Sequence, residues 1–282
     1  MKTAYLVMEP YVFYQKMDIN SSKCIHVMNL SPLPLAPQQQ SITISKDTIK
    51  RLVKDVKEMM KSPLTAHGIH YKHNNEDMLC GQAMIIGPSD TPYEQGYYFF
   101  DFKFPPDYPH SPPVVTYYTN DGVTRFNPNL YKNGKVCLSI LNTWKGDQWS
   151  GCQSISSILL ALCTVLNSEP FLNEPGMTKK HVDFNKYNSV LTYKNFQVAI
   201  VKMIRSDAIK ERFPELHQIM LDDFILNYEK IMKLFLKNYS SSKDIIHVTS
   251  YKMSCYVDYS DVKNELESLY SELTSKKNIH QN

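Results

Sequence analysis

The feature that most constrains the fold of this chain is a cluster of prolines between two strand-like runs. Residues 97–104 are rich in aromatic side chains and begin to alternate as a strand does, and residues 114–118 form a second such run. Prolines fill the connection and exclude both a helix and a central strand there: Pro105, Pro106, Pro109, Pro112 and Pro113. Two strands joined without a helix favour an antiparallel meander, with a further strand at 83–86 that ends at a Gly-Pro turn.

Apolar residues at three- and four-residue steps predict helices around this sheet. We expect one apolar face on a helix at 46–61, a buried helix that begins at Ser154, and further helices at 190–204 and 215–238. The fold class is therefore α+β. A strand-like run precedes a last helix, whose apolar positions have four-three-four spacing: Val262, Leu266, Leu269 and Leu273. This spacing suits a coiled coil, but two short heptads favour packing against the domain, and hence a monomer.

Composition argues against several classes of protein. The 31 Lys and Arg residues nearly balance 28 Asp and Glu residues, which gives no sign of a nucleic-acid or membrane surface. The six cysteines show neither a CxxC pair nor a zinc-like spacing, so we expect reduced thiols, no bound metal and a location in the cytoplasm or nucleus. The proline- and glutamine-rich segment within residues 1–44 predicts a linker or a docking motif.

Residues 119–153 contain many turn-forming residues and little periodicity, and Cys137 lies within them. A long irregular stretch in a compact domain is more often functional than not. Cys137 comes eight residues after Asn129 and three after Gly134, so its thiol is expected to be accessible on a short turn at the edge of the core. A single cysteine taken alone would more often be a small buried hydrophobic residue.

The surroundings of Cys137 resemble the active-site region of ubiquitin-conjugating enzymes. In that family a His-Pro-Asn motif precedes the thioester cysteine at this same spacing, and here Asn127-Pro128-Asn129 takes its place. The resemblance continues in the right order through residues 87–93, the proline segment 104–113 and Trp149-Ser150. Four motifs in register are a specific signal, whereas one alone would be weak. Residues 136–146 and 169–176 are most similar to a subgroup of large members, the enzyme Z subgroup.

The resemblance implies a fold and a division of the chain. It predicts an N-terminal helix, a four-stranded antiparallel meander, a cysteine loop and C-terminal helices over residues 45–207. An arm at 1–44 would precede this core, and a helical extension at 208–282 would follow it.

The resemblance also implies the site residues. Cys137 would carry ubiquitin or a ubiquitin-like modifier as a thioester. Asn129 would donate a hydrogen bond to the charge that develops on oxygen, or would brace the loop. Asn173 stands where many relatives have an Asp that orients the incoming lysine, and its neighbour Glu174 would share that work. For these three residues an ordinary turn or loop role is the alternative.

Partner sites follow from the same resemblance. The helix at 46–61 would dock the activating enzyme with a basic face that includes Lys46, Lys50 and Lys54, although a solvated face is the plainer interpretation. His110 stands at a ligase-contacting position, beside Trp149. Asn127 in place of His, Ser139 in place of Asp, and Gly151-Cys152 in place of Pro-Ala depart from the family pattern.

The predicted function is acyl transfer. The chain would accept the modifier from an activating enzyme, which consumes the ATP, and pass it to a substrate lysine or to a ligase. No cofactor is expected in this chain. The alternatives are a binding protein of the same fold, and a cysteine hydrolase of another fold, for which the cysteine segment offers no His partner.

Overall fold

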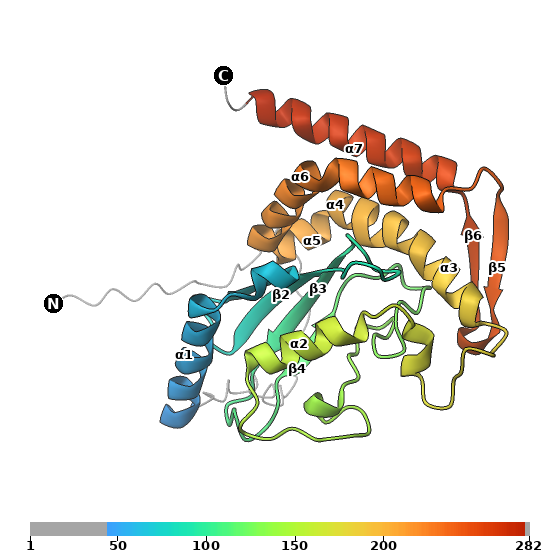
Figure 1. Cartoon of the computed structure of the whole chain (residues 1–282). Helices are drawn as coiled ribbons and strands as arrows, with labels where there is room; N and C mark the ends of the chain where they lie inside the picture. The colour runs from blue at the N-terminus through green and yellow to red at the C-terminus, as the bar shows by residue number, and fades with distance from the viewer. Residues whose placement is uncertain (1–43, 280–282) are drawn as a thin grey trace, which may run out of the picture. The chain divides into compact units, whose positions relative to one another are not determined.

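The computed structural model of the chain describes residues 44–279, so the predicted arm lies outside the described residues except for Ile44. Four antiparallel strands form a sheet in the order β1-β2-β3-β4 (Figure 1). They are β1 (Ile69–His73), β2 (Cys80–Ile86), β3 (Tyr97–Lys103) and β4 (Val114–Tyr117). The meander and the α+β class are confirmed, whereas β1 was not located in the sequence because its polar, half-buried residues carry a weak strand signal.

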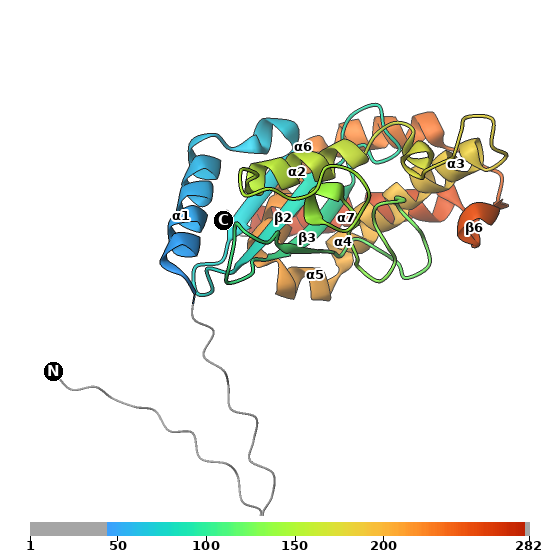
Figure 2. The same cartoon turned by 90° about the horizontal axis from the view of Figure 1, so that it is seen from below.

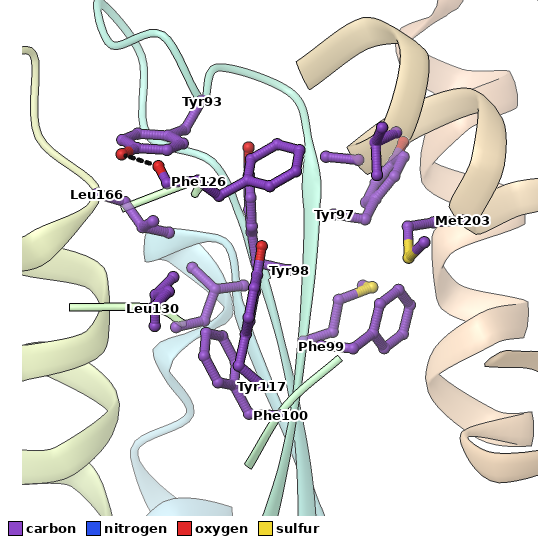
Figure 3. Close-up of a cluster of buried hydrophobic side chains, with 14 of the residues drawn as sticks. Tyr93, Tyr97, Tyr98, Phe99, Phe100, Tyr117, Phe126, Leu130, Leu166 and Met203 are labelled. Carbon is purple, nitrogen blue, oxygen red and sulfur yellow. Dashed lines mark hydrogen bonds between the residues drawn. The ribbon is translucent and has the colours of Figure 1, made fainter. Parts of the chain in front are cut away.

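Both faces of the sheet are covered, which explains the aromatic run in β3. Tyr98 and Phe100 lie on one side of the sheet with Tyr117, whereas Tyr97 and Phe99 lie on the other side near Met203 (Figure 3). Successive strand residues point to opposite faces, and these strand residues are almost completely buried. A strand buried on both faces reads as a continuous apolar run rather than a clean alternation.

Helix α1 (Lys46–Lys61) has the predicted bounds, and the Ser45 hydroxyl caps it by accepting from the Thr48 amide at 3.0 Å. Its apolar stripe is only partly used. Leu52 and Met59 are buried, whereas Ile49, Val53 and Met60 remain exposed. The predicted apolar face is therefore present, but only part of it is buried, because only one side of α1 meets the rest of the domain.

Short helices η1 (Leu64–His67) and η2 (Ser139–Leu141) interrupt the loops. Helix α2 (Ile155–Val165) begins with a capping box between Ser154 and Ser157, as its N-terminal serine predicted. The 3₁₀-helix η3 (Pro170–Asn173) follows.

The helix predicted at 190–204 begins earlier in the structure. It runs through α3 (Phe184–Lys194), a π-helical stretch η4 (Asn195–Lys202) and α4 (Met203–Arg205). The buried Asn195 amide accepts from the Tyr98 hydroxyl at 2.6 Å and donates to the Glu94 carbonyl at 2.8 Å where this stretch begins. The first turns of α3 contain polar residues, so apolar periodicity does not reveal where this helix begins.

The C-terminal extension is mainly helical, as predicted, and its first strand falls on the predicted strand-like run. It contains α5 (Asp207–Arg212), α6 (Pro214–Asn238), a hairpin of β5 (Asp244–Val248) and β6 (Met253–Val257), and α7 (Tyr259–Ile279). The short helix η5 (Thr249–Tyr251) forms the tip of the hairpin. Strand β6 was missed, although its buried Met253, Cys255 and Val257 alternate with exposed residues as in a half-buried strand.

The extension packs against the core, and the two belong to one compact unit. Helix α7 buries Val262, Leu266 and Leu269, as predicted, and the Tyr228 and Tyr270 rings stack with centroids 3.8 Å apart. Phe213 packs against Phe99 on the sheet, with centroids 5.2 Å apart. The predicted boundary at 207/208 falls within α5 and stays a prediction.

Helix α1 and the β5–β6 hairpin lie at opposite ends of this unit (Figures 1 and 2). None of the helices within residues 44–279 is long and apolar enough to cross a membrane.

Candidate active site

The backbone of Cys137 is held by Asn129 on a tight turn. The Cys137 amide donates to the Asn129 carbonyl at 2.8 Å, and the Asn129 side-chain amide donates to the Cys137 carbonyl at 2.7 Å. Gly134 has a φ of 87° at the end of the turn, which favours glycine, and a β-carbon there would come within 3.0 Å of the Tyr117 carbonyl oxygen. The spacing in the sequence therefore brings Asn129 and Cys137 directly opposite each other.

Thr143 holds the same segment from the other side. Its hydroxyl accepts from the Leu138 amide at 2.9 Å and lies 2.9 Å from the Val136 carbonyl, the two residues that flank Cys137. The next turn is fixed by Asn142, whose side chain accepts from the Trp149 amide at 2.8 Å. The main chain on both sides of Cys137 is thus clamped, and sequence reasoning missed the part played by Thr143.

Cys137 is less accessible than the sequence suggested. The residue is only 2% exposed, and its neighbours Val136 and Leu138 are buried as well. The clamp explains the difference, because it seats this segment against the core. Lys135 and Asn142 remain exposed, so the cysteine lies just below the surface.

Three other cysteines are poor nucleophiles. Burial raises the pKa of Cys163 and of Cys255. Burial, together with the Asp77 carboxylate that accepts from its thiol, raises the pKa of Cys80 to about 11. These thiols stay protonated near neutral pH, and the thiolate is the reactive form.

Asn127 forms the floor of the site. This fully buried side chain donates to the Tyr93 hydroxyl at 2.8 Å and to the Val165 carbonyl at 2.7 Å, and it accepts from the Asn129 amide at 2.9 Å. A buried amide with these partners is structural. The residue that replaces the family's His therefore orients Asn129.

The Asn129 side chain occupies the position of a brace, one of its two expected roles. Its nitrogen carries two hydrogens and uses one of them on the Cys137 carbonyl among the described residues. Its oxygen is buried without a hydrogen-bond partner in the described part of the chain. The second N–H is the group that could serve a developing oxyanion.

Asn173 and Glu174 point to different partners although they are neighbours. Asn173 donates to the Val165 carbonyl at 3.0 Å and accepts from the Asn167 side chain at 2.8 Å, and its nitrogen lies 3.4 Å from the Asn127 oxygen. Its amide is thus engaged in holding η3 beside the Asn-Pro-Asn turn. Glu174 instead accepts from the Tyr251 hydroxyl at 3.3 Å, so its carboxylate faces the C-terminal extension.

Arg125 joins the two sides of the site and was not predicted. It donates to the Asn127 carbonyl at 2.9 Å and to the Pro128 carbonyl at 2.6 Å. Its guanidinium lies 3.2 Å from the centre of the Tyr131 ring and 5.9 Å from that of Tyr251. Tyr131 is therefore packed against the Arg125 guanidinium. A lone Arg before an Asn-Pro-Asn turn gives little signal in the sequence.

The predicted partner-binding residues lie on connected segments. Lys46, Lys50 and Lys54 are exposed on α1, and His110 is exposed on the proline segment. Trp149 is half-buried and donates from its indole to the Pro109 carbonyl at 2.8 Å.

One network links α1 to both of these loops. The buried Asp55 accepts from Arg51 and from the Tyr108 hydroxyl, and Arg51 also donates to the Gly151 and Gln153 carbonyls. The three segments therefore form one continuous surface. Sequence spacing places Arg51 and Asp55 on one helix face, but it does not reveal that Asp55 is buried.

Comparison with known proteins identifies the class to which this site belongs. Residues 51–199 match the family model described as ubiquitin-conjugating enzyme, so the chain belongs to that family. Among its members it resembles ubiquitin-conjugating enzyme E2 Z, as the sequence motifs predicted. The zebrafish (Danio rerio) protein is 37% identical over 209 residues, which cover 73% of this chain and 62% of that relative. The Xenopus tropicalis protein is 31% identical over 242 residues, which cover 82% and 74% respectively.

This chain thus spans less than two thirds of the zebrafish relative's length. A solved structure, human ubiquitin-conjugating enzyme E2 G1, matches 43% of this chain and 94% of its own length at 29% identity, with a TM-score of 0.38. The fold assignment rests on the family match and on the observed helix, meander and cysteine turn.

Proposed function

We propose that this chain accepts ubiquitin or a ubiquitin-like modifier as a thioester on Cys137 and passes it to a substrate lysine or to a ligase. The observation that carries this proposal is the clamp on Cys137, in a chain of the ubiquitin-conjugating family. Asn129 and Thr143 fix the backbone on both sides of the sulfur. A fixed nucleophile beside an amide donor is the arrangement that acyl transfer requires.

In the first step the Cys137 thiolate attacks the thioester carbonyl carbon of the modifier carried by the activating enzyme. A new C–S bond forms, the old one breaks, and the activating enzyme leaves as a thiolate. No energy source is needed in this chain, because one thioester replaces another. The activating enzyme consumes the ATP. We expect its docking to displace the side chains that cover Cys137.

In the second step a neutral lysine amine attacks the same carbonyl carbon. A C–N bond forms, the C–S bond breaks, Cys137 leaves as a thiolate, and the amine nitrogen gives a proton to solvent. The second N–H of Asn129 stabilises the negative charge that develops on the carbonyl oxygen. Glu174 draws the lysine ammonium toward the site before it loses its first proton.

The partners follow from the family. The activating enzyme docks on the exposed basic face of α1, and a ligase docks across the connected segments that carry His110 and Trp149. The protein works as a monomer in the cytoplasm or nucleus, without a cofactor of its own.

The 2% exposure of Cys137 favours one alternative, a binding protein of the same fold that carries no thioester. A cysteine hydrolase has no such support, because within residues 44–279 the side-chain hydrogen bonds to the Cys137 segment come from Asn129 and Thr143 and not from a histidine.

The test is to incubate the protein with an activating enzyme, ATP and modifier and to separate the products on a non-reducing gel. We expect an adduct that thiols remove, that Cys137→Ala abolishes and that Cys152→Ala leaves intact, because Cys152 is exposed and lies on another loop. If none of several activating enzymes and modifiers gives an adduct, the binding protein is the correct interpretation.

A further inference from the structure

The tip of the β5–β6 hairpin reaches the side of the site that carries Glu174. The two strands run beside α3, and their turn lies near its first residues (Figure 1). Tyr251, in this turn, donates to Glu174 at 3.3 Å across 77 positions of sequence. A residue of the C-terminal extension thus contacts the carboxylate assigned above to the incoming lysine.

The Tyr251 side chain is held by its surroundings. Its ring packs against Tyr187 and Phe171, with centroids 5.0 and 6.1 Å away. Burial first, and then the negative charge of Glu174, raise the pKa of Tyr251 well above its usual value. The hydroxyl therefore stays protonated near neutral pH and can donate to the carboxylate.

The hairpin tip is also held by hydrogen bonds to the segment that precedes α3. The Ser250 amide and hydroxyl both donate to the same carboxylate oxygen of Asp183, each at 2.8 Å, and Asp183 is buried just before α3. Met253 contacts the backbone amide of Arg125 through its sulfur at 3.0 Å. Because Arg125 holds the carbonyls of the Asn-Pro-Asn turn, the hairpin tip and the Cys137 turn share a common support.

We propose that Tyr251 is a positioning residue that fixes the Glu174 carboxylate where the acceptor lysine approaches. This inference rests on the proposed function. The neighbouring Asn173, at the position of the family's orienting Asp, has turned its amide toward Val165 and Asn167. The extension thereby supplies the orientation that the core no longer provides.

The experiment compares two nucleophiles after Cys137 has been charged and the activating enzyme stopped. Free lysine is mostly an ammonium ion near neutral pH and would use a positioned carboxylate, whereas hydroxylamine is neutral and would not. We expect Tyr251→Phe to slow discharge to lysine about three- to tenfold, the weight of one partly exposed hydrogen bond to a charged group. Discharge to hydroxylamine should keep the wild-type rate.

Three further variants sharpen the test. Glu174→Gln should show the same selective loss, and the double variant should lose no more than Glu174→Gln alone, because the two residues act as one unit. Tyr256→Phe is the matched control, since that tyrosine is 54% exposed on the same hairpin. It should behave as wild type with both nucleophiles.

The inference is overturned if Tyr251→Phe discharges to lysine at the wild-type rate, or if it slows both nucleophiles equally, which would indicate general damage. Thermal unfolding of each variant separates that damage from a local effect. If the wild-type protein forms no Cys137 adduct, the proposed function itself fails and this inference falls with it.

Discussion

The two sides of the Cys137 site are built in different ways. On the near side, Asn129 and Thr143 hold main-chain atoms at and beside the cysteine, through hydrogen bonds that span at most eight residues of sequence. On the far side, Glu174 and Tyr251 meet through side chains that are 77 positions apart. The near side fixes the backbone that carries the sulfur, whereas the far side is the one that we propose to position the acceptor lysine. A change on the near side should therefore affect every reaction of Cys137, and a change on the far side only the choice of acceptor.

The largest effect is expected from Asn129→Ala. It removes the donor to the Cys137 carbonyl and the N–H proposed for the oxyanion, so discharge to every nucleophile should fall about 10²–10³-fold. Single-turnover discharge from the preformed thioester measures this. Asn129→Asp, which keeps the shape and lacks the N–H groups, should be equally slow. A less than threefold loss in both variants would remove the distinction between the two sides.

Arg125→Lys should disturb both sides at once. It loses the planar fork that reaches the Asn127 and Pro128 carbonyls and the stacking on Tyr131, which we expect to cost about 2 kcal/mol of folding stability. Urea unfolding measures that loss. Arg205→Lys, at an exposed ion pair, is the control and should change stability by about 0.5 kcal/mol or less. Equal losses of folding stability in the two variants would show that the Arg125 contacts do not stabilise the site.

Thr143→Val tests the near side with less disruption. The Leu138 amide loses its acceptor, so stability should fall by about 1–2 kcal/mol, and thioester formation on Cys137 should slow. Thr143→Ser keeps the hydroxyl and should restore the rate of formation. If serine and valine behave alike, the hydroxyl does not hold the cysteine segment.

Asp183→Asn tests the carboxylate that holds the hairpin tip through Ser250. It should have the smallest effect, a loss of about 1 kcal/mol in the free energy of unfolding. Burial alone would raise the pKa of Asp183, but the hydrogen bonds from Ser250 outweigh it and hold that pKa below its usual value. A depressed folded-state pKa stabilises the protein above the unfolded pKa of about 4, and this contribution is lost as pH falls through the folded value. Urea unfolding of the wild type and of Asp183→Asn between pH 3 and pH 7 should show the difference in their free energies of unfolding shrinking in acid. A difference that does not change with pH would contradict the stabilising role of the ionised Asp183.

Features that depend on neighbours in sequence were the ones that the sequence predicted well. The bounds of α1, the Ser154 cap and the face of α7 that packs inward follow from local periodicity and capping. The pairing of Asn129 with Cys137 follows from an eight-residue spacing around a glycine turn.

Features that depend on the assembled fold were missed. Nothing near Glu174 in the sequence indicates Tyr251, because the two residues meet only after the β5–β6 hairpin has formed and packed beside α3. The inward turn of Asn173 likewise depends on Val165 and Asn127, which reach it only when α2 and the Asn-Pro-Asn turn are packed together.

The amide at position 127 also decides how the floor of the site responds to acid. An imidazole there would gain a proton within the range of about pH 5 to 8, and its acceptor nitrogen would become a donor. A carboxamide has no such equilibrium, so the contacts of Asn127 with Tyr93, Val165 and Asn129 keep their direction throughout that interval. The hydrogen bonds that Asn127 makes beneath the cysteine turn therefore do not depend on pH in this range.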